Sequence, residues 1–150
     1  MNALFAFLHH LAAFVLFAAV FMELVLIKGV LTDWSARKIR LYDLIYGMAA
    51  MTVIAVGILR VVYFEKGAAY YLHSIPFIVK ISSFALVGLL SIYPTMQFMK
   101  WRAPLKWGET PVLDPALRKR IARLIHFELA GLAIVILCAA LMAKGIGYFG

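Results

Sequence analysis

Ionisable side chains inside long apolar stretches are the residues of this sequence that could do chemistry. Glu23 is the only formal charge between residues 3 and 27, and Lys80 is the only one between residues 74 and 99. Glu128 lies in a third apolar stretch, 121–143. Because charged groups are costly in hydrocarbon, they mark functional sites there by default. Carboxyl groups at such positions could carry protons, and a histidine beside them could bind a metal.

These side chains must be positioned by helices that cross a membrane. A bilayer core of about 30 Å needs about 20 apolar residues in a helix. Four windows satisfy that requirement, over residues 3–27, 41–64, 74–99 and 121–143. Since every backbone polar group in lipid needs an internal partner, each window predicts a helix. We therefore predict an all-α integral membrane protein, a single four-helix transmembrane domain over residues 1–150.

The composition excludes several functional classes. The chain has 150 residues, of which 65% are hydrophobic and 15% are charged, and its formal net charge is +8. Its mean hydropathy is +0.96, so there is no soluble face broad enough for a nucleic-acid footprint. The single cysteine, Cys138, excludes an intrachain disulfide, a cysteine zinc site and covalent attachment of c-type haem. Any haem or metal is expected to be held non-covalently.

The basic residues predict the orientation in the membrane. Eleven of the 15 Lys and Arg residues flank the first and third connections between the windows. By the positive-inside rule these connections face the cytosol, and both termini face the outside. Trp34, Trp101 and Trp107 fall on the same side, as expected of an interfacial aromatic belt. The eleven cations are Lys28, Arg37, Lys38, Arg40, Lys100, Arg102, Lys106, Arg118, Lys119, Arg120 and Arg123.

An outer polar layer is predicted from the depth of four residues. Counted from the centres of their windows, His9 and His10 lie about 10 Å from the midplane, Lys80 about 9 Å and Arg60 about 12 Å. His9 is within about 40° of Glu23 around the first helix, whereas His10 is about 100° away from His9. We therefore expect His9 to be an axial metal ligand to a b-type haem. His10 is a further cofactor-binding candidate, and Lys80 and Arg60 would pair with the haem propionates.

Other interpretations of this layer stay open. His10 could be hydrated at the interface, and Arg60 could extend to the outer headgroups. A second axial ligand could come from His10, His73 or Met22, or be absent. His126 is excluded as a partner of His9 because the two differ in depth by about 19 Å on straight helices.

An inner polar layer is predicted in the other half of the bundle. Glu23 and Asp43 lie about 10 to 13 Å from the midplane, and His126 and Glu128 about 6 to 9 Å. Glu23 and Glu128 are expected to be catalytic groups that carry protons, with Asp43 as a further member. Alternatively, Asp43 caps the second helix. His126 and Glu128 are about 200° apart, so only one of them can face the bundle centre.

Small residues follow Asp43 along the second window. Gly47, Ala50, Ile54 and Gly57 recur at alternating spacings of three and four residues. Small side chains allow membrane helices to approach closely. The pattern predicts that this stripe faces the bundle and carries Asp43 inward.

The sequence resembles an uncharacterised bacterial membrane family, the domain of unknown function 2214, over nearly its whole length. This resemblance implies a four-helix fold in a bacterial membrane, and no activity. From the resemblance together with the positive-inside rule, we expect a multi-pass protein of the inner membrane with both termini in the periplasm. The resemblance is carried by Tyr42-Asp43, Tyr46-Gly47, Gly57, Arg60, Glu65-Lys66-Gly67, Pro76-Phe77, Lys80 and Leu90-Ser91-Ile92-Tyr93-Pro94-Thr95.

More distantly, the chain resembles two other four-helix families, the haem-containing membrane protoporphyrinogen oxidases and the copper-resistance-type membrane proteins. In the oxidase family the histidine matched by His9 is a haem-ligand candidate, and Lys80 matches a lysine. The segments involved are Leu8-His9, Phe17-Ala18-Ala19-Val20-Phe21, and Arg123 with Glu128 and the run 132–137. Phe127 replaces an asparagine of that family, and its arginine near the position of Glu23 is missing.

Two classes of function are therefore expected. The first is a haem-dependent membrane oxidoreductase with a quinone or porphyrin-like partner. In it, His9, His10, Arg60 and Lys80 hold the haem, and Glu23 and Glu128 carry protons. The alternative is a non-enzymatic small transporter or a membrane assembly protein with a polar intramembrane site. The lipid bilayer is a partner in both. The sequence leaves open the substrate, the electron partner and whether the chain forms a homo-oligomer.

Overall fold

The computed structural model describes residues 2–64 and 68–149, and it is all α-helical apart from one isolated bridge between Ser74 and Tyr148. The chain forms α1 (Asn2–Lys28), α2 (Asp33–Leu59), a π-helical turn η1 (Arg60–Phe64), α3 (Ala68–Leu72), α4 (Ile75–Lys100), α5 (Arg102–Lys106) and α6 (Pro115–Ala143). Glu65, Lys66 and Gly67, which are among the residues that carry the family resemblance, lie outside the described residues.

Four helical stretches are long and apolar enough to cross a membrane. Within the described residues they are Ala3–Lys28, Asp33–Tyr63, Ile75–Lys106 and Pro115–Ala143. The all-α, four-helix membrane fold expected from the sequence is therefore confirmed. Large apolar side chains cover the outside of the helices, for example Phe14, which is 80% exposed. Such side chains are expected to face lipid.

Two helices begin earlier than their apolar windows because polar residues cap them. Thr32 and Ser35 form a capping box: the Thr32 hydroxyl accepts from the Ser35 amide at 3.1 Å, and the Ser35 hydroxyl accepts from the Thr32 amide at 2.8 Å. The helix α2 therefore starts at Asp33 rather than at residue 41. Likewise, the Asp114 carboxylate accepts from the amides of Ala116 and Leu117, and α6 starts at Pro115.

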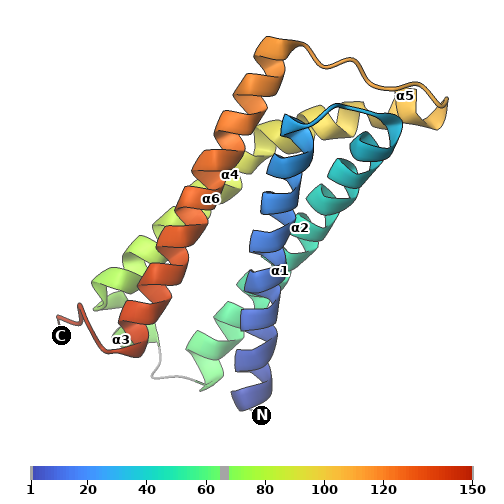
Figure 1. Ribbon diagram of the computed structural model, residues 1–150. Helices are drawn as coiled ribbons and strands as arrows, with labels where there is room; N and C mark the ends of the chain where they lie inside the picture. The colour runs from blue at the N-terminus through green and yellow to red at the C-terminus, as the bar shows by residue number, and fades with distance from the viewer. Residues whose placement is uncertain (1, 65–67, 150) are drawn as a thin grey trace.

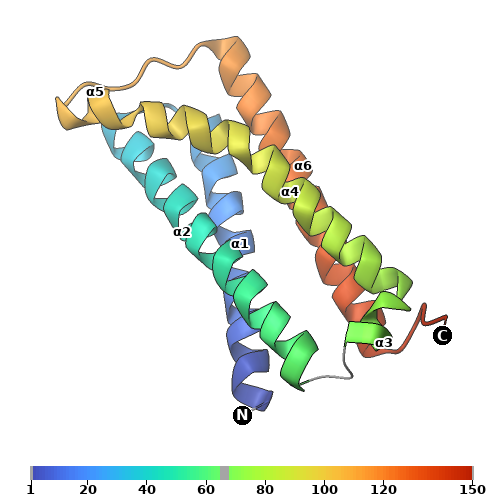
Figure 2. The same ribbon diagram turned by 180° about the vertical axis from the view of Figure 1, so that it is seen from behind.

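The helices are arranged as two antiparallel pairs, α1 with α2 and α4 with α6. The pairs meet mainly where α1 packs on α6, and to a lesser degree where α2 contacts α4. Both termini lie at one end of the bundle, and the connections 29–32 and 107–114 lie at the other (Figure 1). We call the latter the basic end. Seen from behind, the two pairs diverge toward the end that carries the termini (Figure 2).

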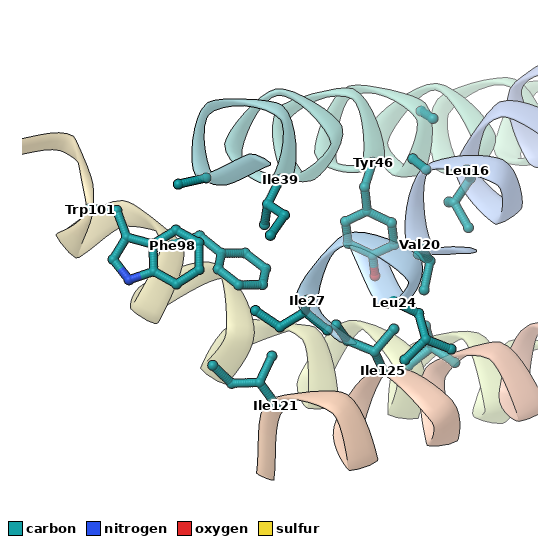
Figure 3. Close-up of a cluster of buried hydrophobic side chains, with 14 of the residues drawn as sticks. Leu16, Val20, Leu24, Ile27, Ile39, Tyr46, Phe98, Trp101, Ile121 and Ile125 are labelled. Atoms are coloured by element: carbon teal, nitrogen blue, oxygen red, sulfur yellow. The ribbon is translucent and has the colours of Figure 1, made fainter. Parts of the chain in front are cut away.

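The apolar core is concentrated toward the basic end. Figure 3 shows side chains of α1, α2, α4 and α6 meeting there, among them Ile27, Ile39, Phe98 and Ile125. The guanidinium of Arg37 donates to the Leu105 carbonyl at 2.5 Å, which joins the first connection to the third. Because the two connections are held together, the basic residues on both belong to one face of the membrane.

One tryptophan does not belong to the expected aromatic belt. Trp34 and Trp107 are exposed, but Trp101 is only 6% exposed and packs on Phe98 with ring centroids 5.0 Å apart. Trp101 lies at the junction between α4 and α5, where it is buried against Phe98. Its role is to close the core at the basic end.

The opposite end is closed by the C-terminal segment. The Ile75 amide donates to the Gly147 carbonyl at 2.9 Å, and the Phe149 amide donates to the His73 carbonyl at 3.0 Å. Tyr148 stacks on Tyr70 with ring centroids 4.5 Å apart. These contacts fasten residues 147–149 to the junction between α3 and α4.

Candidate functional site

Glu23 lies on the buried face of α1. Leu16, Val20, Leu24 and Ile27 recur at helical spacing and turn this face into the bundle, and Glu23 falls within it. The residue is only 3% exposed, and its Oε1 has no hydrogen-bond partner among the described residues. A carboxyl group is therefore held in the apolar contact between α1 and its neighbours.

Glu128 occupies the corresponding position on α6. It is 2% exposed and lies between Ile125 and Leu132, which are also buried. Its Oε1 likewise has no hydrogen-bond partner within the described part of the chain. Glu128 lies close enough to Glu23 for the two carboxyl groups to interact electrostatically. The structure thus brings together the two residues that the sequence indicated as proton carriers.

Asp43 is the third carboxyl group of this cluster. It accepts a hydrogen bond from the Thr95 hydroxyl at 2.6 Å, and it interacts electrostatically with both Glu23 and Glu128. The alternative that Asp43 caps the second helix is wrong, because α2 begins ten residues earlier and is capped by Thr32. Asp43 instead connects α2 to α4 inside the bundle.

Tyr46 completes the polar layer. Its ring points from α2 into the core (Figure 3), where it is 8% exposed. The hydroxyl lies within hydrogen-bonding reach of the Ser91 side chain and close to all three carboxyl groups. Sequence reasoning assigned Tyr46 no chemistry. The available signal was its spacing, since Tyr46 lies one helical turn after Asp43 and therefore shares its face.

The predicted stripe of small residues on α2 is only partly correct. Gly47 has no neighbour within 4 Å of a Cβ position, and Ile54 is 43% exposed. The buried side chains are Tyr46, Ala49 and Val56. Gly57, at the end of the stripe, does face another helix, because the His9 ring lies against it.

A second group of polar residues lies toward the end that carries the termini. The Cε1 and Nδ1 atoms of the His9 ring face Gly57 on α2, with Cε1 3.3 Å from the place where a Cβ would be. His9 lies close enough to Lys80 on α4 and Arg60 on η1 to interact electrostatically. The predicted outer set of His9, Arg60 and Lys80 is therefore close together in space.

The Nδ1 atom of the His9 ring is not held by a hydrogen bond of normal geometry to the described residues. This nitrogen is also buried. The Val53 carbonyl is near enough for a looser contact with the ring. The imidazole is positioned by packing on Gly57.

The other three histidines have hydrogen-bond partners of their own, and the ring of His10 lies edge-on to that of His9 with ring centroids 6.1 Å apart. His10 is exposed, and its Nδ1 bonds the carbonyl of Ala6 on its own helix at 2.6 Å. His73 bonds the Ala69 carbonyl at the α3–α4 junction. His126 is exposed and contacts Lys28 at 3.1 Å. The question of which residue faces the bundle centre is thus resolved in favour of Glu128 over His126.

The inner cluster has a charge arrangement suited to proton transfer. Among the described residues, no Lys, Arg or His forms an ion pair with Glu23 or Glu128, and the cation near Asp43 is Arg40 on the same helix. A buried carboxylate without a counter-charge is strongly disfavoured. The pair can therefore be neutralised by protons, which hydroxyl groups such as Tyr46 can donate or accept.

The comparisons with known proteins decide the family. The family model described as "Predicted membrane protein (DUF2214)" matches residues 1–147. The chain belongs to this family. The family membership expected from the sequence resemblance is therefore confirmed over nearly the whole chain. No curated protein and no solved structure matches the chain.

Membership in the DUF2214 family establishes a membrane protein and carries no activity. The more distant resemblance to haem-containing oxidases and copper-resistance-type proteins stays a prediction. Function must therefore be argued from the two polar groups of this structure.

Proposed function

We propose that this chain is a proton-coupled membrane protein in which Glu23 and Glu128 take up and release protons. The observation that carries the proposal is the arrangement of the two groups. They come from different helices, both are almost fully buried, and each has an oxygen without a hydrogen-bond partner among residues 2–64 and 68–149. A pair that served only to hold α1 against α6 would be expected to have these oxygens hydrogen-bonded.

Protons are favoured over metal ions as the cargo of the cluster. A metal site needs several oxygen or nitrogen ligands at short distance around one point. The carboxyl groups do not converge as such a ligand set among the described residues. A proton needs only one oxygen at a time, and it can pass between groups through short hydrogen bonds.

Access to the pair is shorter from the basic end. Glu23 precedes the end of α1 by only five residues, or roughly 8 Å of helix. In the other direction it is separated from His9 by roughly 21 Å of helix, over which Leu16 and Val20 are buried. Ile27 and Ile121 are buried on the shorter route as well. A proton can therefore reach the pair from either end only when apolar side chains move apart.

Infrared spectroscopy of the carboxyl groups tests this proposal. A protonated carboxyl that lacks hydrogen bonds absorbs at a higher C=O stretching frequency than one in water. We expect pH-induced difference spectra of the purified protein to contain such a high-frequency band, which Glu23→Gln and Glu128→Gln each reduce. Glu109→Gln, in an exposed loop, is the matched control and should leave the band intact. A band insensitive to both core substitutions would contradict the proposal.

A second candidate function, haem-linked redox chemistry, is supported by the group around His9. The residues fit one axial imidazole from His9 and two cationic partners for propionates, Lys80 and Arg60. His9 is the histidine that lies close to both Lys80 and Arg60, so we expect it to be the histidine ligand of any haem. When bound, haem would supply one-electron transfer to a quinone or porphyrin-like partner, and Glu23 and Glu128 would supply the protons.

A visible spectrum distinguishes this second function. We expect protein made with ample haem to show a Soret band that His9→Ala removes and His10→Ala retains, because His9, unlike the exposed His10, is packed on Gly57 beside Lys80 and Arg60. A colourless, fully folded wild-type protein would contradict haem binding and leave the proton proposal standing.

The orientation in the membrane is part of the proposal. We infer that the basic end faces the cytosol and that both termini are periplasmic in the inner membrane. Alkaline phosphatase, which is active only outside the cytosol, should be active when fused to the C-terminal residue and inactive when fused after Trp107. The reverse pattern would contradict the inference and place proton uptake on the periplasmic side.

A further inference from the structure

A basic groove lies at the edge of the bundle, outside both polar groups described above. It has a volume of about 450 Å³ and opens between the end of α1 and the first half of α6. Its lining includes Lys28, Arg118, Lys119, Arg123, His126 and Phe127. The groove begins at the basic end of the molecule (upper part of Figure 1). From Arg118 to Phe127 it extends roughly 13 Å along the helix.

The groove concentrates positive charge without a neutralising partner. Within the described part of the chain, no carboxylate forms an ion pair with Lys28, Arg118, Lys119 or Arg123. The Nε of Arg118 is buried and has no hydrogen-bond partner there. A guanidinium group presents its N–H donors in a planar fork that matches the geometry of phosphate oxygens.

Lys28 is held in place by His126. The Nδ1 of His126 lies 2.6 Å from the Ala122 carbonyl and donates to it. The Nε2 of that tautomer is an acceptor, and Lys28 donates to it at 3.1 Å. This contact directs the Lys28 ammonium group toward α6, which carries Arg118, Lys119 and Arg123, although like charges repel.

The deep end of the groove is apolar. Phe127 is 57% exposed at a level where the helix is expected to be surrounded by acyl chains. Cations near the membrane surface with an aromatic ring below them form an amphipathic pattern. A free phosphate ion would use the cations and leave Phe127 without a role, whereas a phospholipid uses both.

We propose that this groove binds an anionic phospholipid, with its headgroup phosphate on Arg118, Lys119 and Arg123 and an acyl chain against Phe127. Basic pockets between membrane helices bind anionic headgroups in this manner. The lipid supplies the negative charge that the protein lacks at this point. It also joins α1 to α6 at the contact that connects the two helix pairs.

Native mass spectrometry of the purified protein in a neutral detergent tests the proposal. Titration with phosphatidylglycerol should give a first bound lipid at lower concentration than titration with phosphatidylcholine. The double variant Arg118→Gln/Arg123→Gln should raise the apparent Kd of that first lipid by about tenfold, since it removes two charge-assisted contacts. Lys119→Gln, at an exposed position, should raise the Kd by a smaller factor and serves if the double variant fails to fold.

The matched control is Arg102→Gln/Lys106→Gln, which removes the same charge from exposed positions of α5 at the same end. This variant should bind phosphatidylglycerol like the wild type. Equal losses in both double variants would show attraction by net charge alone and overturn the proposal. Glycerol phosphate that competes as strongly as the lipid would show a site for a soluble phosphate and overturn it as well.

Discussion

The contact between α1 and α6 is the constraint on which the rest of this structure depends. It is the main connection between two helix pairs that otherwise touch little. Two carboxyl groups lie in this contact, and they lack the basic partners that usually accompany buried acids. Because an unpaired buried polar group costs about 1 to 3 kcal/mol, Glu23 and Glu128 weaken the contact that joins the bundle. The proposed uptake and release of protons would account for their presence at this contact.

The apolar residues around the pair offset that cost. Val20 and Ile125 are completely buried beside Glu23 and Glu128, and Leu132 is nearly so. Gly131 faces Val87 so closely that a Cβ would lie 2.5 Å from its Cγ2, which brings α6 tightly against α4. Close packing below the basic end therefore holds α4 and α6 together, while the opposite half, where His9, Lys80 and Arg60 gather, is less tightly joined. This difference is consistent with the proposal of a fixed proton site in one half and a larger partner in the other.

The sequence predicts much of this arrangement because the membrane reduces the number of solutions. Apolar windows of the right length must be helices, and ionisable residues within them are expected to face inward, as Glu23, Glu128 and His9 do. The starts of α2 and α6 were missed because Thr32 and Asp114 extend each helix into polar sequence that a hydropathy window does not count. The late start predicted for α2 also placed Asp43 near the N-terminal end of the helix, where it could be interpreted as a cap.

Residues whose position depends on tertiary contacts could not be predicted. Tyr46 and Thr95 acquire their roles from neighbours on other helices, and Trp101 is buried at the junction between α4 and α5. The choice between His126 and Glu128 required the rotation of α6, which is set by its packing on α1 and α4. His9 and His10 are adjacent in the sequence. Which of their two rings packs on α2 depends on the position of that helix, so it could not be predicted from the sequence.

Replacing both buried carboxyl groups with apolar side chains tests the central claim most directly. The variant Glu23→Met/Glu128→Met keeps the volume of the contact and removes its unpaired polar atoms. The free energy of unfolding in detergent, measured by denaturant titration, should stay equal to that of the wild type or rise by about 1 to 4 kcal/mol. A fall of about 2 kcal/mol or more would contradict the account, because the carboxyl groups would then be structural links between α1 and α6.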